Sequence, residues 1–95
     1  MKLEGSCHCS SVRFSVESHT PYPYQRCYCS ICRKVAGGGG YTVNIMAEMA
    51  SLQVWGKENL TVYRSPKNDR DKYEDDGLGF SRRHFCAKCG TMLWN

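Results

Sequence analysis

The residues in this chain best suited to chemistry are its cysteines, seven among 95 residues. They fall into three closely spaced clusters: Cys7-x-Cys9, Cys27-x-Cys29-x-x-Cys32 and Cys86-x-x-Cys89. Two cysteines this close together in a tight turn direct both sulfurs toward one ion and supply two corners of a tetrahedron. The spacing therefore predicts metal sites, and zinc is the metal that such thiolate sites favour.

The C-terminal pair has the form of a zinc knuckle. Gly90 follows the second cysteine, where a positive φ relieves crowding, and we expect a strand on each side of the turn. Cys7 and Cys9, at the opposite end of the chain, complete a four-thiolate site with Cys86 and Cys89. Such a site leaves no coordination position open, so we expect it to be structural and to tie the chain ends together.

The middle cluster predicts a different kind of site. Cys27, Cys29 and Cys32 offer three thiolates close together, and no fourth cysteine remains for them. Three protein ligands and a vacant position are the arrangement of a reactive zinc site, so these cysteines are the predicted catalytic ligands. Three thiolates make a bound zinc a modest Lewis acid, which suits holding a substrate thiolate better than generating hydroxide. Basic residues nearby, such as Arg26, favour the thiolate forms.

Other uses of the cysteines stay open at this point. Disulfides would leave one cysteine over, and a redox role for Cys86 and Cys89 lacks the βαβ pattern that accompanies such pairs. A histidine, either His8, His19 or His84, can complete the middle cluster as a second structural zinc site. The middle cysteines can also be metal-free thiols.

The elements that must position these cysteines are mostly strands. Val12, Phe14 and Val16 alternate with polar residues, which is the period of a half-buried strand. Further strands are expected at residues 41–45, 52–55, 60–63, 78–85 and 91–94. Residues 56–59 predict a hairpin between segments 52–55 and 60–63. With one helical turn after Ser30 as its N-cap, the sequence predicts a mainly β fold of small antiparallel sheets.

Two stretches predict irregular structure. Four consecutive glycines at residues 37–40 exclude regular structure and would let a peptide-like ligand lie against bare backbone. Residues 65–79 are polar and rich in charged side chains, which predicts a long exposed loop.

Composition and charge limit the classes of protein to which this chain can belong. The chain is long enough for one domain, whose small core is expected to need metals, disulfides or association. The net charge of +4 includes no long run of like charges, so nucleic-acid binding is not expected. The basic groups Arg33-Lys34 and Arg82-Arg83-His84 are expected to be solvated surface. We expect no membrane span and no secretory signal, hence a cytoplasmic protein with reduced thiols. The oligomeric state stays open.

Three ordered motifs resemble those of a known family. They are Gly5-Ser6-Cys7-His8-Cys9, Cys27-Tyr28-Cys29-Ser30-Ile31-Cys32-Arg33-Lys34 and Phe85-Cys86-Ala87-Lys88-Cys89-Gly90-Thr91. The glutathione-dependent formaldehyde-activating enzyme family has the similar motifs Gly-x-Cys-His-Cys, Cys-x-Cys-Ser-x-Cys-Arg and Phe-Cys-x-x-Cys-Gly. Ser10 stands where the family usually has glycine. Family domains usually continue beyond the second knuckle, so we expect residues 1–95 to be one zinc-binding domain, either truncated at its C-terminus or a short member.

The resemblance implies a fold, two zinc ions and a reaction. The implied fold is a β-tent of the Mss4-like type, closed by a structural zinc at the four outer cysteines. The implied reactive zinc lies at the middle cluster, with Gly38, Gly39 and Gly40 lining its pocket. The implied reaction joins glutathione, the co-substrate, reversibly to formaldehyde as S-hydroxymethylglutathione, which is carbon–sulfur lyase chemistry on a small-molecule thiol and aldehyde. The alternative is a non-catalytic zinc module that binds a protein partner, which a histidine at the middle site would favour.

Overall fold

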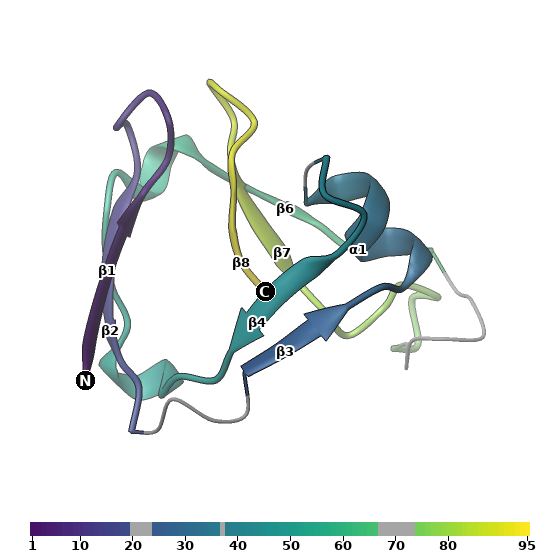
Figure 1. The fold of residues 1–95 in the computed structure, drawn as a ribbon. Helices are drawn as coiled ribbons and strands as arrows, with labels where there is room; N and C mark the ends of the chain where they lie inside the picture. The colour runs from purple at the N-terminus through teal and green to yellow at the C-terminus, as the bar shows by residue number, and fades with distance from the viewer. Residues whose placement is uncertain (20–23, 37, 67–73) are drawn as a thin grey trace.

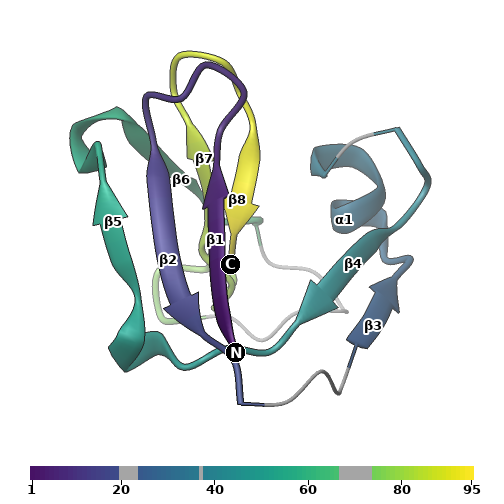
Figure 2. The same cartoon turned by 60° about the vertical axis from the view of Figure 1, so that its left-hand side comes forward.

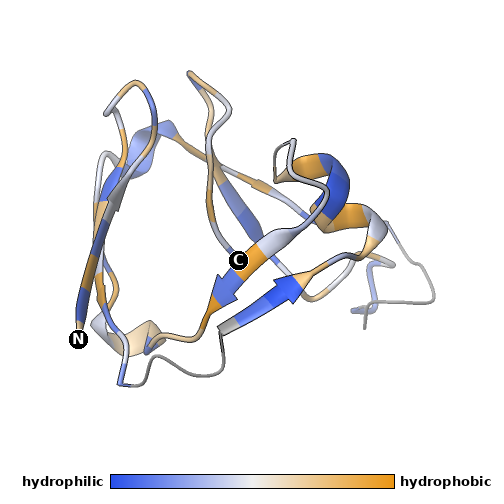
Figure 3. Cartoon of the chain, viewed as in Figure 1, coloured by the Kyte–Doolittle hydropathy of each residue, from blue (hydrophilic) through white to orange (hydrophobic). Residues whose placement is uncertain are grey.

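The computed structural model of this chain describes residues 1–19, 24–36, 38–66 and 74–95. Its strands form three small antiparallel sheets, and its helices are short, which confirms the predicted mainly β fold. Figure 1 shows the sheets standing around a common centre, with the chain ends in neighbouring sheets. The hydropathy of the chain alternates over short segments rather than concentrating in one long hydrophobic element (Figure 3).

Sheet A contains β1 (Lys2–Ser6), β2 (Arg13–Glu17) and β5 (Gln53–Trp55), with β2 in the centre. Strand β2 confirms the predicted strand, but Ser15, which the alternation placed on the polar face, is buried at 7% exposure. Strand β1 was not predicted, because its sequence has little apolar alternation. Gly5 pairs with Phe14 across β1 and β2, and a Cβ on Gly5 would lie 2.5 Å from the phenyl ring. The glycine therefore lets the aromatic ring cover the edge strand.

Sheet C contains β6 (Leu60–Tyr63), β7 (Arg83–Cys86) and β8 (Met92–Trp94). The expected strand at 78–85 thus begins later than predicted. Sheets A and C meet through an edge-to-face contact of Phe14 with Trp94, whose ring centroids are 5.1 Å apart. Between these sheets, Cys7, Val12 and Cys86 form a buried cluster. Because two of these three residues are cysteines, the apolar core alone provides little stabilisation.

The predicted hairpin across residues 56–59 is wrong, because β5 and β6 belong to different sheets. The 3₁₀ turn η2 (Lys57–Asn59) instead leads the chain from sheet A to sheet C. Gly56 has φ +84°, and a Cβ there would lie 1.9 Å from the carbonyl oxygen of Ser11. Asn59 Nδ2 donates to the same oxygen over 3.3 Å. Gly56, which suggested a hairpin, therefore allows the backbone at this position to pass close to the β1–β2 loop.

Sheet B contains β3 (Tyr24–Cys27) and β4 (Thr42–Ile45), and α1 (Ser30–Val35) connects them together with residues 36–41. Strand β4 was expected, but β3 was not. The expected N-cap is also wrong by one residue, since Cys29, not Ser30, caps the helix and accepts a hydrogen bond from Cys32 N over 3.4 Å. The turned view of Figure 2 shows sheet B and α1 set apart from sheet A, with β7 and β8 behind β1. A short 3₁₀ turn, η1 (Met49–Ser51), precedes β5.

The polar stretch at 65–79 is anchored at both ends rather than simply exposed. Arg64 forms ion pairs with Glu74 at 3.2 Å and Asp76 at 2.8 Å, and its Nε donates to the Gly79 carbonyl over 3.0 Å. Ser65 is buried, as is Gly79. The prediction of an exposed loop is therefore wrong for Ser65 and Gly79, whereas Pro66, Asp75 and Asp76 are exposed. The central part, 67–73, lies outside the described residues.

Candidate active site and metal centres

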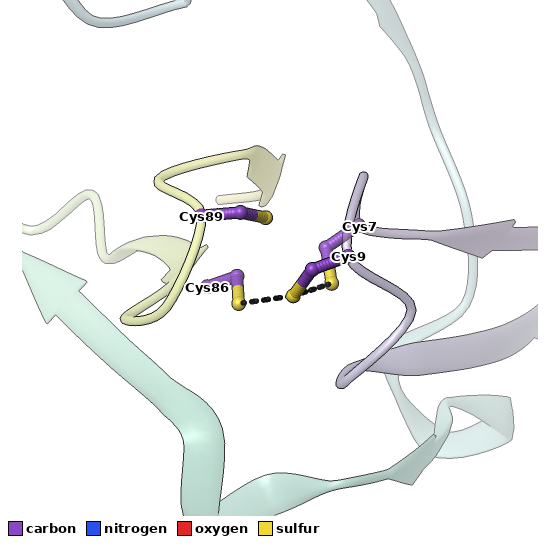
Figure 4. Close-up of side chains that lie close together, drawn as sticks. All are labelled: Cys7, Cys9, Cys86 and Cys89. Atoms are coloured by element: carbon purple, nitrogen blue, oxygen red, sulfur yellow. Dashed lines mark hydrogen bonds between the residues drawn. The ribbon is translucent and has the colours of Figure 1, made fainter.

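The two outer cysteine pairs meet in one group. Figure 4 shows the sulfurs of Cys7, Cys9, Cys86 and Cys89 directed toward one another from the β1–β2 and β7–β8 loops. All four Sγ atoms lie within 4.8 Å of one another, with separations of 3.6 Å between Cys7 and Cys9 and 3.7 Å between Cys9 and Cys86. Ligands on a tetrahedral zinc with Zn–S bonds of about 2.3 Å stand roughly 3.8 Å apart, whereas disulfide sulfurs stand about 2.05 Å apart. All seven cysteines are free, and this group has the dimensions of a metal site.

The turns that carry these cysteines are closed by backbone hydrogen bonds. Ser10 N donates to the Cys7 carbonyl over 3.1 Å, and Gly90 N donates to the Cys86 carbonyl over 2.8 Å. Both turns end in a residue with positive φ, which is +65° at Ser10 and +78° at Gly90. The positive φ predicted at Gly90 is confirmed. Ser10 adopts the conformation that glycine adopts most easily, which explains why the family usually has glycine there.

Donors around this group favour thiolates. Val12 N lies 3.3 Å from Cys7 Sγ, and Lys88 N lies 3.4 Å from Cys86 Sγ, so both amides donate to sulfur. Hydrogen bonding with the Thr91 hydroxyl lowers the pKa of Cys89 to about 5. The same hydroxyl accepts from the backbone N–H of His8 over 3.1 Å, which joins the two loops. The group is therefore held by its own turns, with Cys7 and Cys86 buried and Cys9 and Cys89 exposed.

The three middle cysteines form a second group, with all Sγ atoms within 4.8 Å of one another. Cys27 ends β3, Cys29 caps α1, and Cys32 lies inside that helix. Cys32 is buried at 5% exposure, whereas the other two border an open hollow of about 680 Å³. The hollow is lined by Gln25, Arg26, Cys27, Tyr28, Cys29 and Asn44. This group is therefore accessible from the side of the hollow.

The middle thiols differ in acidity for structural reasons. The Cys32 backbone N–H lowers the pKa of Cys29 to about 7, whereas burial raises the pKa of Cys32 itself. Hydrogen bonds from Arg83 and Thr42 oppose that rise in the Cys32 pKa. Cys29 is therefore substantially ionised near neutral pH even before any metal binds.

The candidate histidines lie elsewhere. No histidine among the described residues joins the middle group within ligand distance. His8 lies in the β1–β2 loop, His19 pairs with Glu48 at 2.9 Å, and His84 stacks on Trp94 with ring centroids 5.0 Å apart. The structure thus does not favour completion of the middle site by a histidine.

The glycines expected near the ligand lie in the turn between α1 and β4. Gly38, Gly39 and Gly40 are exposed, and Gly40 has φ +83°. They are not among the residues that line the hollow. Their contact with a ligand stays a prediction.

Arg83 was not predicted as a buried residue. It is only 5% exposed, its guanidinium opposes the rise in the pKa of Cys32, and its Nη1 is buried without a hydrogen-bond partner. The expectation of a solvated Arg82-Arg83-His84 surface is therefore wrong for its central residue. Successive residues of a strand point to opposite faces, so adjacent arginines in a strand were a usable signal that one points inward.

Two tyrosines and an arginine also lie next to one another at the hollow. The rings of Tyr28 and Tyr41 have centroids 5.5 Å apart, and the Arg26 guanidinium lies 5.0 Å from the centroid of Tyr41. Arg26 and Tyr28 line the hollow directly. A positive charge is therefore held beside Cys27 and Cys29.

Three small antiparallel sheets carrying one group of four cysteines and one of three define a cysteine-rich β domain of the Mss4-like type. Comparison with known proteins identifies the family. The model of the family described as glutathione-dependent formaldehyde-activating enzyme matches residues 2–95, and the chain belongs to this family.

Two relatives agree with this assignment. A protein of Halomonas elongata named "Putative glutathione-dependent formaldehyde-activating enzyme" is 50% identical over 95 residues, which are 99% of this chain and 55% of that protein. The chain thus spans about half the length of this curated relative. A crystal structure of a Rhodobacter sphaeroides protein is 30% identical with a TM-score of 0.67, covering 96% of this chain and 71% of that one. No helix among the described residues is long and apolar enough to cross a membrane.

Proposed function

We propose that this chain is a zinc-dependent enzyme of the carbon–sulfur lyase type that joins glutathione reversibly to formaldehyde, giving S-hydroxymethylglutathione. The observation that carries the proposal is the middle group, where three sulfurs converge beside an open hollow and no fourth ligand residue joins them among the described residues. Membership of the family supports glutathione and formaldehyde as the substrates. The need for free thiols makes a reducing compartment, the cytoplasm, part of the proposal.

Cys27, Cys29 and Cys32 would hold the reactive zinc, and Cys7, Cys9, Cys86 and Cys89 the structural one. The donor sets fit, because thiolate sulfurs at these separations suit a tetrahedral zinc. When bound at the middle group, zinc supplies a Lewis-acidic fourth position for a thiolate. The Cys32 N–H and the Arg83 guanidinium favour the thiolate forms of their cysteine partners.

The hollow would hold the rest of the thiol substrate. Glutathione carries carboxylates and amides, and Arg26, Gln25 and Asn44 offer a guanidinium and two amide groups along the lining. In the reaction the thiol sulfur bonds to the carbonyl carbon of formaldehyde, while the carbonyl π bond breaks and its oxygen takes the proton that the thiol loses. The reverse reaction breaks the carbon–sulfur bond and returns that proton. The task of the protein is to hold the sulfur ionised and oriented.

The test is the rate of exchange between ¹³C-formaldehyde hydrate and S-hydroxymethylglutathione, measured by exchange NMR against the spontaneous rate. We expect the zinc-loaded protein to accelerate exchange and Cys27→Ser to remove the acceleration. Val35→Ser is the matched control, since Val35 is 39% exposed on the helix that carries Cys32 and is expected to leave the rate unchanged. Native acceleration retained in Cys27→Ser would refute the proposal.

A non-catalytic module that binds a protein partner is the second candidate. Exposed apolar side chains at the end of β4 and in η1 favour it, with Met46 59% and Met49 75% exposed. Under this alternative, a protein with both metal sites loaded leaves the exchange rate at its spontaneous value. The same NMR experiment therefore separates the two candidates.

A further inference from the structure

Sheet A has one face turned toward sheet C and one face turned outward. Phe14 points toward sheet C, where its ring contacts Trp94. Successive residues of a strand point to opposite faces, so the neighbours of Phe14 on β2, Arg13 and Ser15, point outward. Figure 1 shows β1 and β2 at one side of the molecule, with sheets B and C on their inner side. The outward face of sheet A is therefore a surface separate from both cysteine groups.

This outward face carries a second hollow, of about 360 Å³, which shares no lining residue with the hollow beside the middle group. Its outward-pointing lining residues come from all three strands of the sheet: Glu4, Ser6, Arg13, Ser15 and Trp55. Strand pairing sets them side by side, since Arg13 pairs with Ser6 on one side and with Trp55 on the other. Small-molecule sites have volumes of roughly 300–1,000 Å³, so the hollow is large enough for a small ligand.

Ser15 is the most buried residue of this lining. It is only 7% exposed, because it lies on the central strand between larger neighbours of the same face. Its hydroxyl makes no hydrogen bond with any other described residue. Buried polar side chains are almost always hydrogen-bonded, and a buried hydroxyl without a partner lowers stability. The Ser15 hydroxyl is therefore available to a ligand that enters the hollow.

The charges at the hollow leave a cation without a partner. Glu4 pairs with Lys2 at 3.3 Å, so its carboxylate is already neutralised. Arg13 is exposed, and its guanidinium forms no ion pair or hydrogen bond with another described residue. Next to it, Trp55 is 49% exposed and offers an aromatic surface. The hollow therefore combines a guanidinium, which suits a carboxylate, with an indole, which suits a second aromatic ring.

We propose that the outward face of sheet A is a binding site for a small aromatic carboxylate. The ring of the ligand lies against Trp55, and its carboxylate accepts hydrogen bonds from the Arg13 guanidinium and the Ser15 hydroxyl. An organic cation does not fit, because Arg13 repels it and Glu4 already has Lys2 as its partner. The inference does not rest on the proposed function, since no cysteine lines this hollow.

The test is ¹H–¹⁵N NMR of the zinc-loaded protein during titration with 2-naphthoate at neutral pH. The indole N–H signal of Trp55 is followed, and Trp55→Leu identifies it, since the chain has two tryptophans. We expect a saturable shift with a Kd on the order of 1 mM, an ordinary affinity for a ligand of this size. The uncharged analogue 2-naphthamide should bind at least about fivefold more weakly, because it lacks the carboxylate. No saturable shift, or equal affinities for the two ligands, would overturn the inference.

Variants show where the ligand binds. Arg13→Met should weaken 2-naphthoate binding at least about fivefold and change 2-naphthamide binding by less than about twofold, and Ser15→Ala should weaken 2-naphthoate binding about threefold. Arg26→Met is the matched control, because it removes the same charge at the other hollow and should leave both affinities unchanged. An affinity for 2-naphthoate that depends on Arg26 and not on Arg13 would place the ligand beside the middle group and overturn the inference. Native affinity in Ser15→Ala would contradict the role of its hydroxyl.

Discussion

The two cysteine groups of this protein use the same side chain in different settings. The outer group is held by two turns from opposite ends of the chain and takes part in the buried cluster between sheets A and C. The middle group lies on a two-stranded sheet and a short helix and borders a hollow. On the proposed function, the count of three sulfurs instead of four and the adjoining hollow, not the ligand type, distinguish the reactive site from the structural one.

Substitution of Cys86 in the outer group is expected to have the largest effect on stability. Cys86 is fully buried, and removing its sulfur removes a metal ligand and part of the core together. Structural zinc contributes on the order of 10 kcal/mol to folding in small zinc domains, so Cys86→Ser should abolish the cooperative thermal transition. Circular dichroism during heating measures this. A Cys86→Ser protein that melts like the native one would show that the outer group is not structural.

Gly56→Ala should have the next largest effect. The positive φ and the contact with the Ser11 carbonyl leave no room for a Cβ, so the loop carrying Cys9 must shift. We expect a loss of about 2–4 kcal/mol in the free energy of unfolding, measured by urea denaturation. Gly38→Ala is the control, because nothing lies within 4 Å of a Cβ there. Equal effects of the two substitutions would contradict the close approach.

Cys27→Ser tests the middle group in the same way. Cys27 is partly exposed at the hollow and lies outside the buried cluster. The variant should therefore lose one of two metal ions per chain while its free energy of unfolding falls by no more than about 1–2 kcal/mol. Metal analysis and urea denaturation measure both quantities. Complete unfolding of Cys27→Ser would place the middle group among the structural elements.

Ser10→Gly should give the smallest effect, and a stabilising one. Ser10 has φ +65°, a conformation that costs a non-glycine residue roughly 1 kcal/mol, of which the flexibility of glycine in the unfolded chain offsets part. We expect a gain of about 0.5 kcal/mol in the free energy of unfolding. Destabilisation of similar size would show that the Ser10 side chain is needed in the turn.

The cysteine spacing predicted much of this structure, because knuckle turns are local. The pair at Cys86 and Cys89, the positive φ of Gly90 and the strand β2 all follow from short stretches of sequence. The pairing of strands does not follow from them, since Gly56 suits a hairpin and a crossover equally well. The burial of Arg83 shows the same limit, because burial is a property of the folded chain and not of the residues next to Arg83 in the sequence.

The central claim is that one cysteine group is closed and the other open to a thiol. Zinc K-edge X-ray absorption on the two-zinc protein, with and without glutathione, tests it. The account predicts a mean of about 3.5 sulfur ligands per zinc that rises to about 4 with glutathione, because only the middle zinc gains a sulfur. A mean that does not change, or a protein that holds a single zinc per chain, would contradict it.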